Sequence, residues 1–188
     1  MPLTARNFEI RDFHPDDFET LWRIDQECFP PGISYSKAEL KTYMRRPGSF
    51  TLVAAGVGDP EVDRQSENHK SHGALSIPKS ASVAGFIVAE AQKHAGHIIT
   101  IDVVAAERKN GLGSRLLAAA EERLQKQRCR SVELETAVDN VAAISFYKRH
   151  GYHVVAAIPH YYSNGVDALV LEKHFEEKRF EAIADRKK

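Results

Sequence analysis

Cysteine, excess charge and long apolar runs are scarce or missing in this sequence, and each absence narrows the class of protein. Only two cysteines occur among 188 residues, Cys28 and Cys129, and neither stands in a CxxC or similar pair. We therefore expect neither a disulfide framework nor a cysteine-based zinc site, and free thiols fit a reducing cytoplasm. The nine histidines show no HExxH spacing, so we predict no metal cofactor.

The charges balance, because 26 lysines and arginines stand against 26 aspartates and glutamates. Proteins that follow nucleic-acid phosphates usually carry a basic excess, so we expect no nucleic-acid partner. No apolar run is long enough to cross a bilayer, and the first residues, MPLTARNFEIRDF, lack an apolar signal core. We expect a cytoplasmic protein without a membrane partner, present as a monomer or weak homodimer.

The length and the hydrophobic content of 43% are enough for one sizeable core. We predict a single domain over 1–175, with a flexible insertion at 56–82 and a charged tail at 176–188. The insertion is polar and has no sustained period, so it cannot bury enough apolar area to offset its ordering entropy.

Periodicity predicts the order of the elements. Alternation of apolar and polar residues, or short β-branched runs, predicts strands at 8–13, 49–55, 83–90, 98–104, 131–136, 153–158 and 168–173. Helical spacing predicts helices at 15–28, 37–44, 112–124 and 141–147. The second of these follows a capping box formed by Ser36 and Glu39, and Asp139 or Asn140 caps the last.

The stretch 98–127 passes from a β-branched run through a short glycine-containing loop into a helix. The loop reads Arg108-Lys109-Asn110-Gly111-Leu112-Gly113-Ser114. Amides at a helix N-terminus attract anionic oxygens, and the two glycines let a phosphate approach them without meeting a Cβ. The loop lacks the GKS/GKT ending of a P-loop and the third glycine of a dinucleotide fingerprint. These residues alone fit a phosphate site and a plain strand-to-helix turn equally well.

The pattern Val103-x-x-x-x-Arg108-x-x-Gly111-x-Gly113 resembles the acyl-CoA pyrophosphate motif, (Q/R)-x-x-G-x-(G/A), of the GNAT superfamily of N-acyltransferases. The similarity continues through Leu134-Glu135, Asn140, Ala143-Ile144, Phe146-Tyr147 and Gly151-Tyr152. One departure is Ala105, where many members have proline, and it affects the stiffness of the loop. The resemblance implies an α/β (α+β) fold: a mixed, mostly antiparallel twisted sheet of six to seven strands, flanked by about four helices, with a central strand splay.

The resemblance also implies acetyl-CoA as cosubstrate. Backbone amides near Val103 and Val104 would then bind the thioester carbonyl, and the Asn140 amide would reach the pantetheine arm. The residues expected to bind acetyl-CoA are Ile101, Val103, Val104, Arg108, Lys109, Asn110, Gly111, Leu112, Gly113, Ser114, Asn140 and Tyr147.

Acetyl transfer to an amine needs a base, a stabiliser for the carbonyl oxygen and a proton donor for the leaving thiolate. The sequence resembles the ribosomal-protein alanine N-acetyltransferase branch, which implies Glu135 as the base and Tyr147 as the acid. From the residues alone, Glu135 could instead be a solvent-facing charge on the same strand face as Glu133. Tyr147 could equally be a packed aromatic beside Phe146.

The segment IPHYYSNGVDALVLEK resembles the C-terminal hairpin of protein N-terminal acetyltransferases, in which paired tyrosines line the peptide groove. A tyrosine pair that closes a hairpin and a connector that covers the core are the alternatives. The leading hypothesis is an acetyl-CoA-dependent N-acetyltransferase acting on a protein N-terminal α-amine. The alternatives are a GNAT enzyme for lysine side chains or small amines, and a non-catalytic CoA-binding module. The residues expected to bind substrate are Phe29, Pro30, Ile33, Tyr35, Tyr161 and Tyr162.

Overall fold

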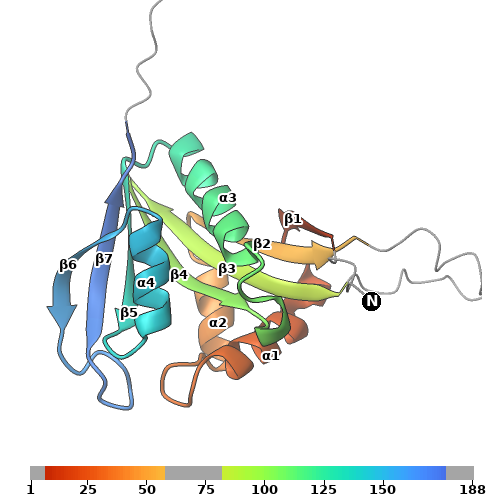
Figure 1. Ribbon diagram of the computed structural model, residues 1–188. Helices are drawn as coiled ribbons and strands as arrows, with labels where there is room; N and C mark the ends of the chain where they lie inside the picture. The colour runs from red at the N-terminus through yellow and green to blue at the C-terminus, as the bar shows by residue number, and fades with distance from the viewer. Residues whose placement is uncertain (1–6, 58–81, 177–188) are drawn as a thin grey trace, which may run out of the picture.

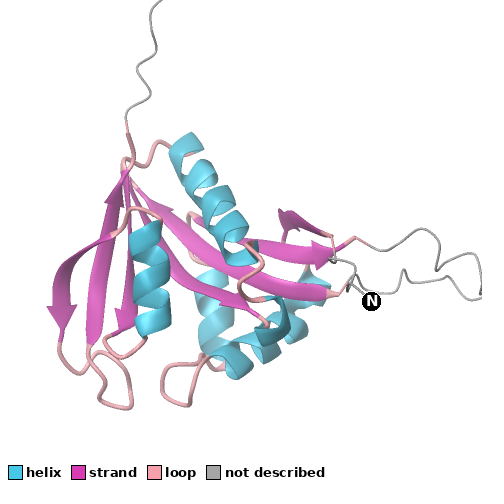
Figure 2. Cartoon of the chain, viewed as in Figure 1, coloured by secondary structure: helices cyan, strands magenta, loops and turns pink. Residues whose placement is uncertain are grey.

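Seven strands and four α-helices make up the part of the chain that the computed structural model describes, residues 7–57 and 82–176 (Figures 1 and 2). The expected insertion at 56–82 and tail at 176–188 lie almost entirely outside the described residues. The strands are β1 (Phe8–Asp12), β2 (Ser49–Gly56), β3 (Val83–Gln92), β4 (Ala95–Val103), β5 (Ser131–Ala137), β6 (His153–Ile158) and β7 (Ala168–His174). The helices are α1 (Phe18–Cys28), α2 (Lys37–Met44), α3 (Leu112–Lys126) and α4 (Val141–Arg149).

Local signals decide where the helices begin. At α2 the Ser36 hydroxyl accepts a hydrogen bond from the Glu39 amide, and the Glu39 carboxylate accepts one from the Ser36 amide, which confirms the predicted capping box. At α4 the side-chain oxygen of Asn140 accepts a hydrogen bond from the Ala143 amide at 3.1 Å. Asn140 is therefore the cap of the two candidates. No helix in the described ranges is both long and apolar enough to span a membrane.

The strands form one sheet in the order β1-β2-β3-β4-β5-β7-β6. Every neighbouring pair is antiparallel except β4 and β5, which run parallel. Helices α3 and α4 cover one face of this sheet, and α1 and α2 cover the other (Figure 1). The predicted mixed, mostly antiparallel fold is confirmed.

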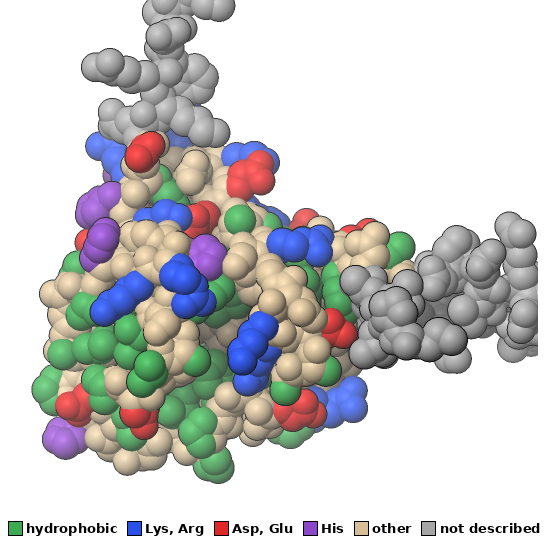
Figure 3. Space-filling view, in the orientation of Figure 1, with side chains coloured by type: hydrophobic (Ala, Val, Ile, Leu, Met, Phe, Trp, Pro, Cys, Tyr) green, Lys and Arg blue, Asp and Glu red, His purple; other side chains and the backbone are tan. Residues whose placement is uncertain are grey.

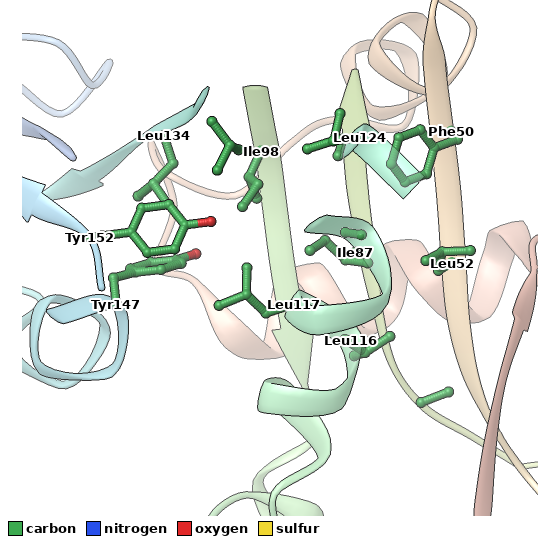
Figure 4. Packing of buried hydrophobic residues seen from close by; sticks show 14 of the residues in the cluster. Phe50, Leu52, Ile87, Ile98, Leu116, Leu117, Leu124, Leu134, Tyr147 and Tyr152 are labelled. Atoms are coloured by element: carbon green, nitrogen blue, oxygen red, sulfur yellow. The ribbon is translucent and has the colours of Figure 1, made fainter. Parts of the chain in front are cut away.

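The sheet separates two hydrophobic cores. Under α3, the side chains of Leu116, Leu117 and Leu124 are fully buried against Ile87 and Ile98 of the sheet (Figure 4). Fully burying one leucine side chain contributes roughly 1.5–3 kcal/mol, so this apolar face holds α3 in place. The buried residues of the second core, between α1, α2 and the other face of the sheet, are Phe18, Leu21, Ile24, Leu40, Val53, Phe86 and Val88.

The two central strands part after a short contact. Strands β4 and β5 pair only from Ala95 opposite Ser131 to Ile98 opposite Leu134. Beyond these four pairs, β4 continues to Val103 along β3, while β5 continues along β7. The sheet is therefore split at its centre, which confirms the predicted splay.

A β-bulge lies in β4 where the strands part. The register with β3 shifts between Val88, which faces Thr100, and Ala89, which faces Ile98, so Ile99 is the extra residue. A bulge bends its strand and increases the local twist, which here turns the end of β4 away from β5. It also breaks the alternation of faces along β4, so His97 and Asp102 share the face that α1 and α2 cover.

A buried hydrogen-bond network joins the two halves of the sheet across α3. The Glu121 carboxylate of α3 accepts a hydrogen bond from the Tyr152 hydroxyl at 3.0 Å and from the Lys173 ammonium of β7 at 2.6 Å. Tyr152 is 1% exposed. Water therefore cannot readily replace Glu121 as the acceptor for the Tyr152 hydroxyl.

Replacing Glu121 with alanine is expected to lower the free energy of unfolding by about 1–3 kcal/mol, because the buried Tyr152 hydroxyl loses its acceptor. Urea denaturation measures the loss as a lower midpoint at an unchanged slope. The matched control is Glu122→Ala on the same helix, which removes an exposed ion pair with Lys126 and should cost much less. Equal losses in the two variants would mean that the buried network does not join the halves.

Candidate active site

The open edge of β4 carries unpaired backbone groups. The Val104 amide donates to the Ala84 carbonyl at 2.9 Å, so residues 104 and 102 belong to the pairs that bond to β3. Because bonding alternates along an antiparallel strand, the amides of Ile101 and Val103 point away from β3 into the split. Of the two amides expected to hold a carbonyl oxygen, the Val103 amide is thus available and the Val104 amide is occupied.

The loop before α3 forms a cradle of free amides. None of the backbone amides of residues 109–114 has a hydrogen-bond partner among the described residues, and Arg115 donates to the Gly111 carbonyl at 3.1 Å. Gly111 has φ +79°, and a Cβ built on it would meet nothing within 4 Å. Free amides at the positive end of a 15-residue helix are suited to anionic oxygens such as those of a pyrophosphate.

Two side chains of this loop bond back to neighbouring elements and hold its shape. The Arg108 guanidinium donates to the Val103 carbonyl at 2.8 Å and to the Cys28 sulfur at 3.3 Å. The Ser114 hydroxyl lies 2.9 Å from Nε2 of His150, whose Nδ1 lies 2.8 Å from the Phe146 carbonyl. Arg108 therefore links the end of β4 to α1.

Asn140 and the surface near it complete this side of the site. The Asn140 side-chain oxygen is used in capping α4, and its NH₂ group has no hydrogen-bond partner among the described residues. That group is free to donate to a ligand amide or carbonyl. Figure 3 shows the surface hollowed between α4 and the loop that precedes α3, with apolar side chains in the hollow.

Glu135 and His97 form a hydrogen-bonded pair at the point where the strands part. Glu135 is the first residue of β5 beyond the pairing with β4, and its Oε2 lies 2.7 Å from Nε2 of His97. The side chains are only 17% and 24% exposed. Glu135 is therefore not the solvent-facing edge charge that strand parity alone would allow.

The charge state of His97 follows from its neighbours. Burial lowers the pKa of the His97 imidazole, but the hydrogen bond and charge of Glu135 outweigh it, and Glu90 adds to the effect, so the pKa is raised. Oε1 of Glu90 lies 3.7 Å from Nδ1 of His97 and 3.6 Å from the Arg46 guanidinium. The pair thus belongs to a chain of alternating charges that reaches the exposed Arg46.

Tyrosines from two distant loops gather beside Glu135. Burial and then the charge of Glu135 raise the pKa of the Tyr161 phenol to about 12. The ring of Tyr162 lies 5.0 Å from that of Tyr161, and Tyr35 lies 5.0 Å from Tyr43. The electrostatic influence of Tyr161 and Tyr162 on Tyr35 places both pairs in one cluster.

The segments that carry these tyrosines contact each other directly. The Ser163 hydroxyl donates to the Gly32 carbonyl at 3.1 Å, which joins the β6–β7 loop to the α1–α2 loop. Phe29 and Ile33 of the latter loop are half-buried, yet neither belongs to the two cores found among the described residues. Pro30 is exposed, and its carbonyl accepts hydrogen bonds from two following amides. Tyr35 of the same loop packs against the second core.

Tyr147 is a packed aromatic with a free hydroxyl. It is 5% exposed, and its ring lies 5.2 Å from Phe146 and 5.4 Å from Tyr152 (Figure 4). Burial raises the pKa of its phenol, and the charges of Asp102 and Tyr162 raise it further. The raised pKa keeps the phenol protonated at neutral pH. No described residue accepts a hydrogen bond from its hydroxyl, which is therefore available to a ligand.

The sequence motifs do not point to His97, Glu90 or Asp102, although two of these residues carry a signal. Asp102 is an acid inside the apolar run 98–104, and Glu90 ends the apolar strand that precedes it. Charged residues are almost never fully buried unless they are paired, so such positions indicate a polar site within the core. His97 carries no local signal. Three or more metal-binding side chains gather nowhere within residues 7–57 and 82–176.

We expect His97 to titrate above the ordinary histidine pKa of about 6.5 in an NMR pH titration of its ring protons. Replacing Glu135 with glutamine should lower that pKa, because burial then acts with less opposition. The matched control is Glu133→Gln on the same strand, whose charge has a smaller influence on His97. If both variants move the midpoint equally, Glu135 is not the main cause of the raised His97 pKa.

The chain is similar to known proteins in sequence and in fold. An N-alpha-acetyltransferase of Sulfurisphaera tokodaii is 35% identical over 77 residues, which are 40% of this chain and 46% of that protein. The chain thus spans about half the length of curated relatives that it matches. The crystal structure of Ard1 from Thermoplasma volcanium superposes with a TM-score of 0.72 at 28% identity, over 90% of this chain and 99% of that one.

The ribosomal-protein-S18-alanine N-acetyltransferase from Escherichia coli has a TM-score of 0.66 at 18% identity, over 92% of this chain and 98% of that one. This likeness is one of fold. The model of the acetyltransferase (GNAT) family matches residues 18–152, which include the glycine loop, Glu135 and Tyr147. The chain belongs to the acetyltransferase (GNAT) family.

Proposed function

We propose that this chain transfers an acetyl group from acetyl-CoA to the α-amine at a protein N-terminus. The observation that carries the proposal is the Glu135–His97 pair, placed where β4 and β5 part and flanked by Tyr161. Glu135, acting as the base, reaches the gap between β4 and β5 from the same face of the sheet as the tyrosine cluster. The free amides of the glycine loop lie beyond the end of the other strand, β4.

The residues present suit acetyl-CoA. The amides of residues 109–114 bind its pyrophosphate, and the Asn140 NH₂ group donates to the pantetheine arm. When bound, acetyl-CoA supplies the acetyl group as an activated thioester. The Val103 amide, on the open edge of β4, donates to the carbonyl oxygen as negative charge develops there. The Val104 amide does not, because Ala84 occupies it.

Glu135 accepts the proton of the acceptor amine. An α-ammonium group has a pKa near 8, so only a modest driving force is needed to remove its proton at neutral pH. The raised pKa of His97 favours its charged form, and its Nε2, 2.7 Å from Oε2 of Glu135, orients that side chain. Glu90 holds the other side of the imidazole and thereby limits its rotation.

The Tyr147 hydroxyl donates a hydrogen bond to the sulfur as the carbon–sulfur bond breaks. Burial and Asp102 raise the pKa of this phenol well above the thiol value of about 8.5, so complete proton transfer to the thiolate is uphill. A hydrogen bond still stabilises the negative charge on sulfur. Tyr147 thus acts as a donor that keeps its proton until late in the reaction.

The tyrosine cluster favours a peptide end as the acceptor. Tyr35, Tyr161 and Tyr162 offer flat apolar surface together with hydroxyls that can bond to peptide carbonyls. Phe29, Pro30 and Ile33 extend this surface along the α1–α2 loop, which the β6–β7 loop contacts. We place the reaction in the cytoplasm, in keeping with the free thiols of Cys28 and Cys129.

Incubation with acetyl-CoA and matched acceptors tests the proposal by release of free thiol. We expect release with peptides that have a free N-terminus. The same peptides blocked at the N-terminus but containing lysine, and small polyamines, should give little. Release with only the blocked peptides or the amines would contradict an N-terminal acceptor. Thermal stabilisation by CoA without release in any arm would show a binding module and no transferase.

Replacing Tyr147 with phenylalanine should lower kcat by roughly 10- to 100-fold while CoA affinity stays nearly unchanged, because the ring remains and only the donor is lost. The matched control is Tyr152→Phe, which removes a buried hydroxyl bonded to Glu121. That variant should be less stable but should turn over normally once folded. An unchanged kcat in Tyr147→Phe would remove Tyr147 from the mechanism.

A further inference from the structure

A histidine at the end of α4 bonds to the first turn of α3. Nδ1 of His150 lies 2.8 Å from the Phe146 carbonyl, and Nε2 lies 2.9 Å from the Ser114 hydroxyl. The imidazole also packs on the Phe146 ring, with the two centroids 4.4 Å apart. Both ring nitrogens are therefore occupied, and these contacts hold the ring in one orientation.

The contact with Phe146 decides which nitrogen carries the hydrogen in a neutral His150. A carbonyl oxygen can only accept a hydrogen bond, so Nδ1 must donate. His150 is the C-cap residue of α4, and the Phe146 carbonyl is one of the last four of that helix, which need a partner from outside it. In the neutral ring, Nε2 then has no hydrogen and can only accept. The Ser114 hydroxyl must donate to it.

Ser114 belongs to the loop whose amides suit a pyrophosphate. It is the third residue of α3, and its own amide has no hydrogen-bond partner among the described residues. Phe146 packs against the preceding residue, because a Cβ built on Gly113 would lie 3.6 Å from the Phe146 ring. The end of α4 and the start of α3 are thus packed together, and the Ser114 hydroxyl is part of the anion cradle.

The charges around His150 are mostly positive. Glu121 is the only carboxylate of the set given below, and it is bonded to Tyr152 and Lys173. Burial raises the pKa of the Tyr147 and Tyr152 phenols, so both stay neutral where histidine titrates. The charged groups on the glycine loop, α3 and α4, the elements packed against His150, are Arg108, Lys109, Arg115, Glu121, Lys148 and Arg149.

We propose that His150 takes up a proton when the pyrophosphate of acetyl-CoA binds, and that Ser114 links this charge to the phosphate. In the protonated ring, Nε2 carries a hydrogen and donates to the Ser114 oxygen. The hydroxyl hydrogen is then free to donate to a phosphate oxygen beside the loop amides. One proton passes from solvent to Nε2, and no bond of the ligand changes. The inference rests on the acetyl-CoA site of the proposed function and is independent of the acceptor.

The two charge states of His150 suit the empty and the occupied loop. Without an anion, the positive end of α3 and the nearby cations disfavour a charged imidazole. A bound pyrophosphate reverses this preference, because it supplies negative charge beside Ser114. The affinity for the ligand should therefore be highest at low pH and should fall as the pH rises through the range of about 5–8 in which histidine titrates. His150 acts through Ser114 and is thus a positioning residue.

Calorimetry with dephospho-CoA measures the proton directly. This probe keeps the pyrophosphate but lacks the 3′-phosphate, whose second pKa of about 6 would interfere. The binding enthalpy at pH 7 in buffers of different ionisation enthalpy gives the number of protons taken up. We expect net uptake by the wild type and an affinity that falls roughly 5- to 10-fold from pH 6 to pH 8. Binding without proton uptake would overturn the proposal.

Two variants test the two links of the relay. His150→Gln keeps a side chain that can donate a hydrogen bond but cannot gain a proton, so uptake should vanish and the affinity should fall most at pH 6. Ser114→Ala keeps the imidazole and removes the hydroxyl, so uptake should fall there too. Uptake that persists in either variant would contradict the relay. The matched control is His94→Gln, in the exposed turn before β4 at the opposite end of that strand from the loop, which should keep the wild-type uptake.

An NMR titration of the wild type tests the proton even if a variant fails to fold. At pH 7 a larger fraction of His150 should be protonated with dephospho-CoA than without it, and an unchanged fraction would overturn the proposal. These readouts need no acetyl transfer. Proton uptake in a protein that acetylates no peptide would leave this inference standing and sink the proposed function. Acetylation of peptides without proton uptake on binding would do the reverse.

Discussion

The parting of β4 and β5 after four residue pairs is the constraint on which the rest of the structure depends. Backbone groups along a parted edge lose their sheet partners, and each must find another or remain open. The Val103 carbonyl accepts hydrogen bonds from the Arg108 guanidinium and the Cys28 thiol. The amides of Ile101 and Val103 point into the split without a partner in the sheet. Because α3 and the Glu121 network hold both halves of the sheet, the gap keeps its shape and its donors stay available.

The same parting explains the charged residues near the middle of the molecule. Glu135 is the first residue of β5 beyond the last pair with β4, and it reaches His97 across the closed end of the split. A charged group that is partly buried is stable only beside a group of opposite charge. The order of contacts meets this need, because residues of opposite charge type alternate along the row Arg46, Glu90, His97 and Glu135. The chemistry and the stability of the site thus rest on the same contacts.

Signals that act over a few residues make the helix starts and the glycine loop predictable. The capping box at Ser36, the cap at Asn140 and the open amides after Lys109 follow from sequence. So do the starts of all strands except β4, which begins at Ala95, before the predicted start at residue 98. The pairing of His97 with Glu135, 38 residues apart, does not, because it depends on the register of two strands and on where they part. The contact of Arg108 with Cys28 depends on the position of α1, which no local pattern predicts.

The bulge at Ile99 shows why strict alternation fails in this strand. His97 and Asp102 are five positions apart, so a regular strand would point them to opposite faces. In the observed register His97 faces Glu90 and Asp102 faces Phe86. Glu90 and Phe86 are four positions apart on a regular strand and share a face, so their partners share it too. One extra residue therefore brings His97, which bonds to Glu135, and the buried Asp102 to the same side of the sheet, while Ile98 and Ile101 stay in the core under α3.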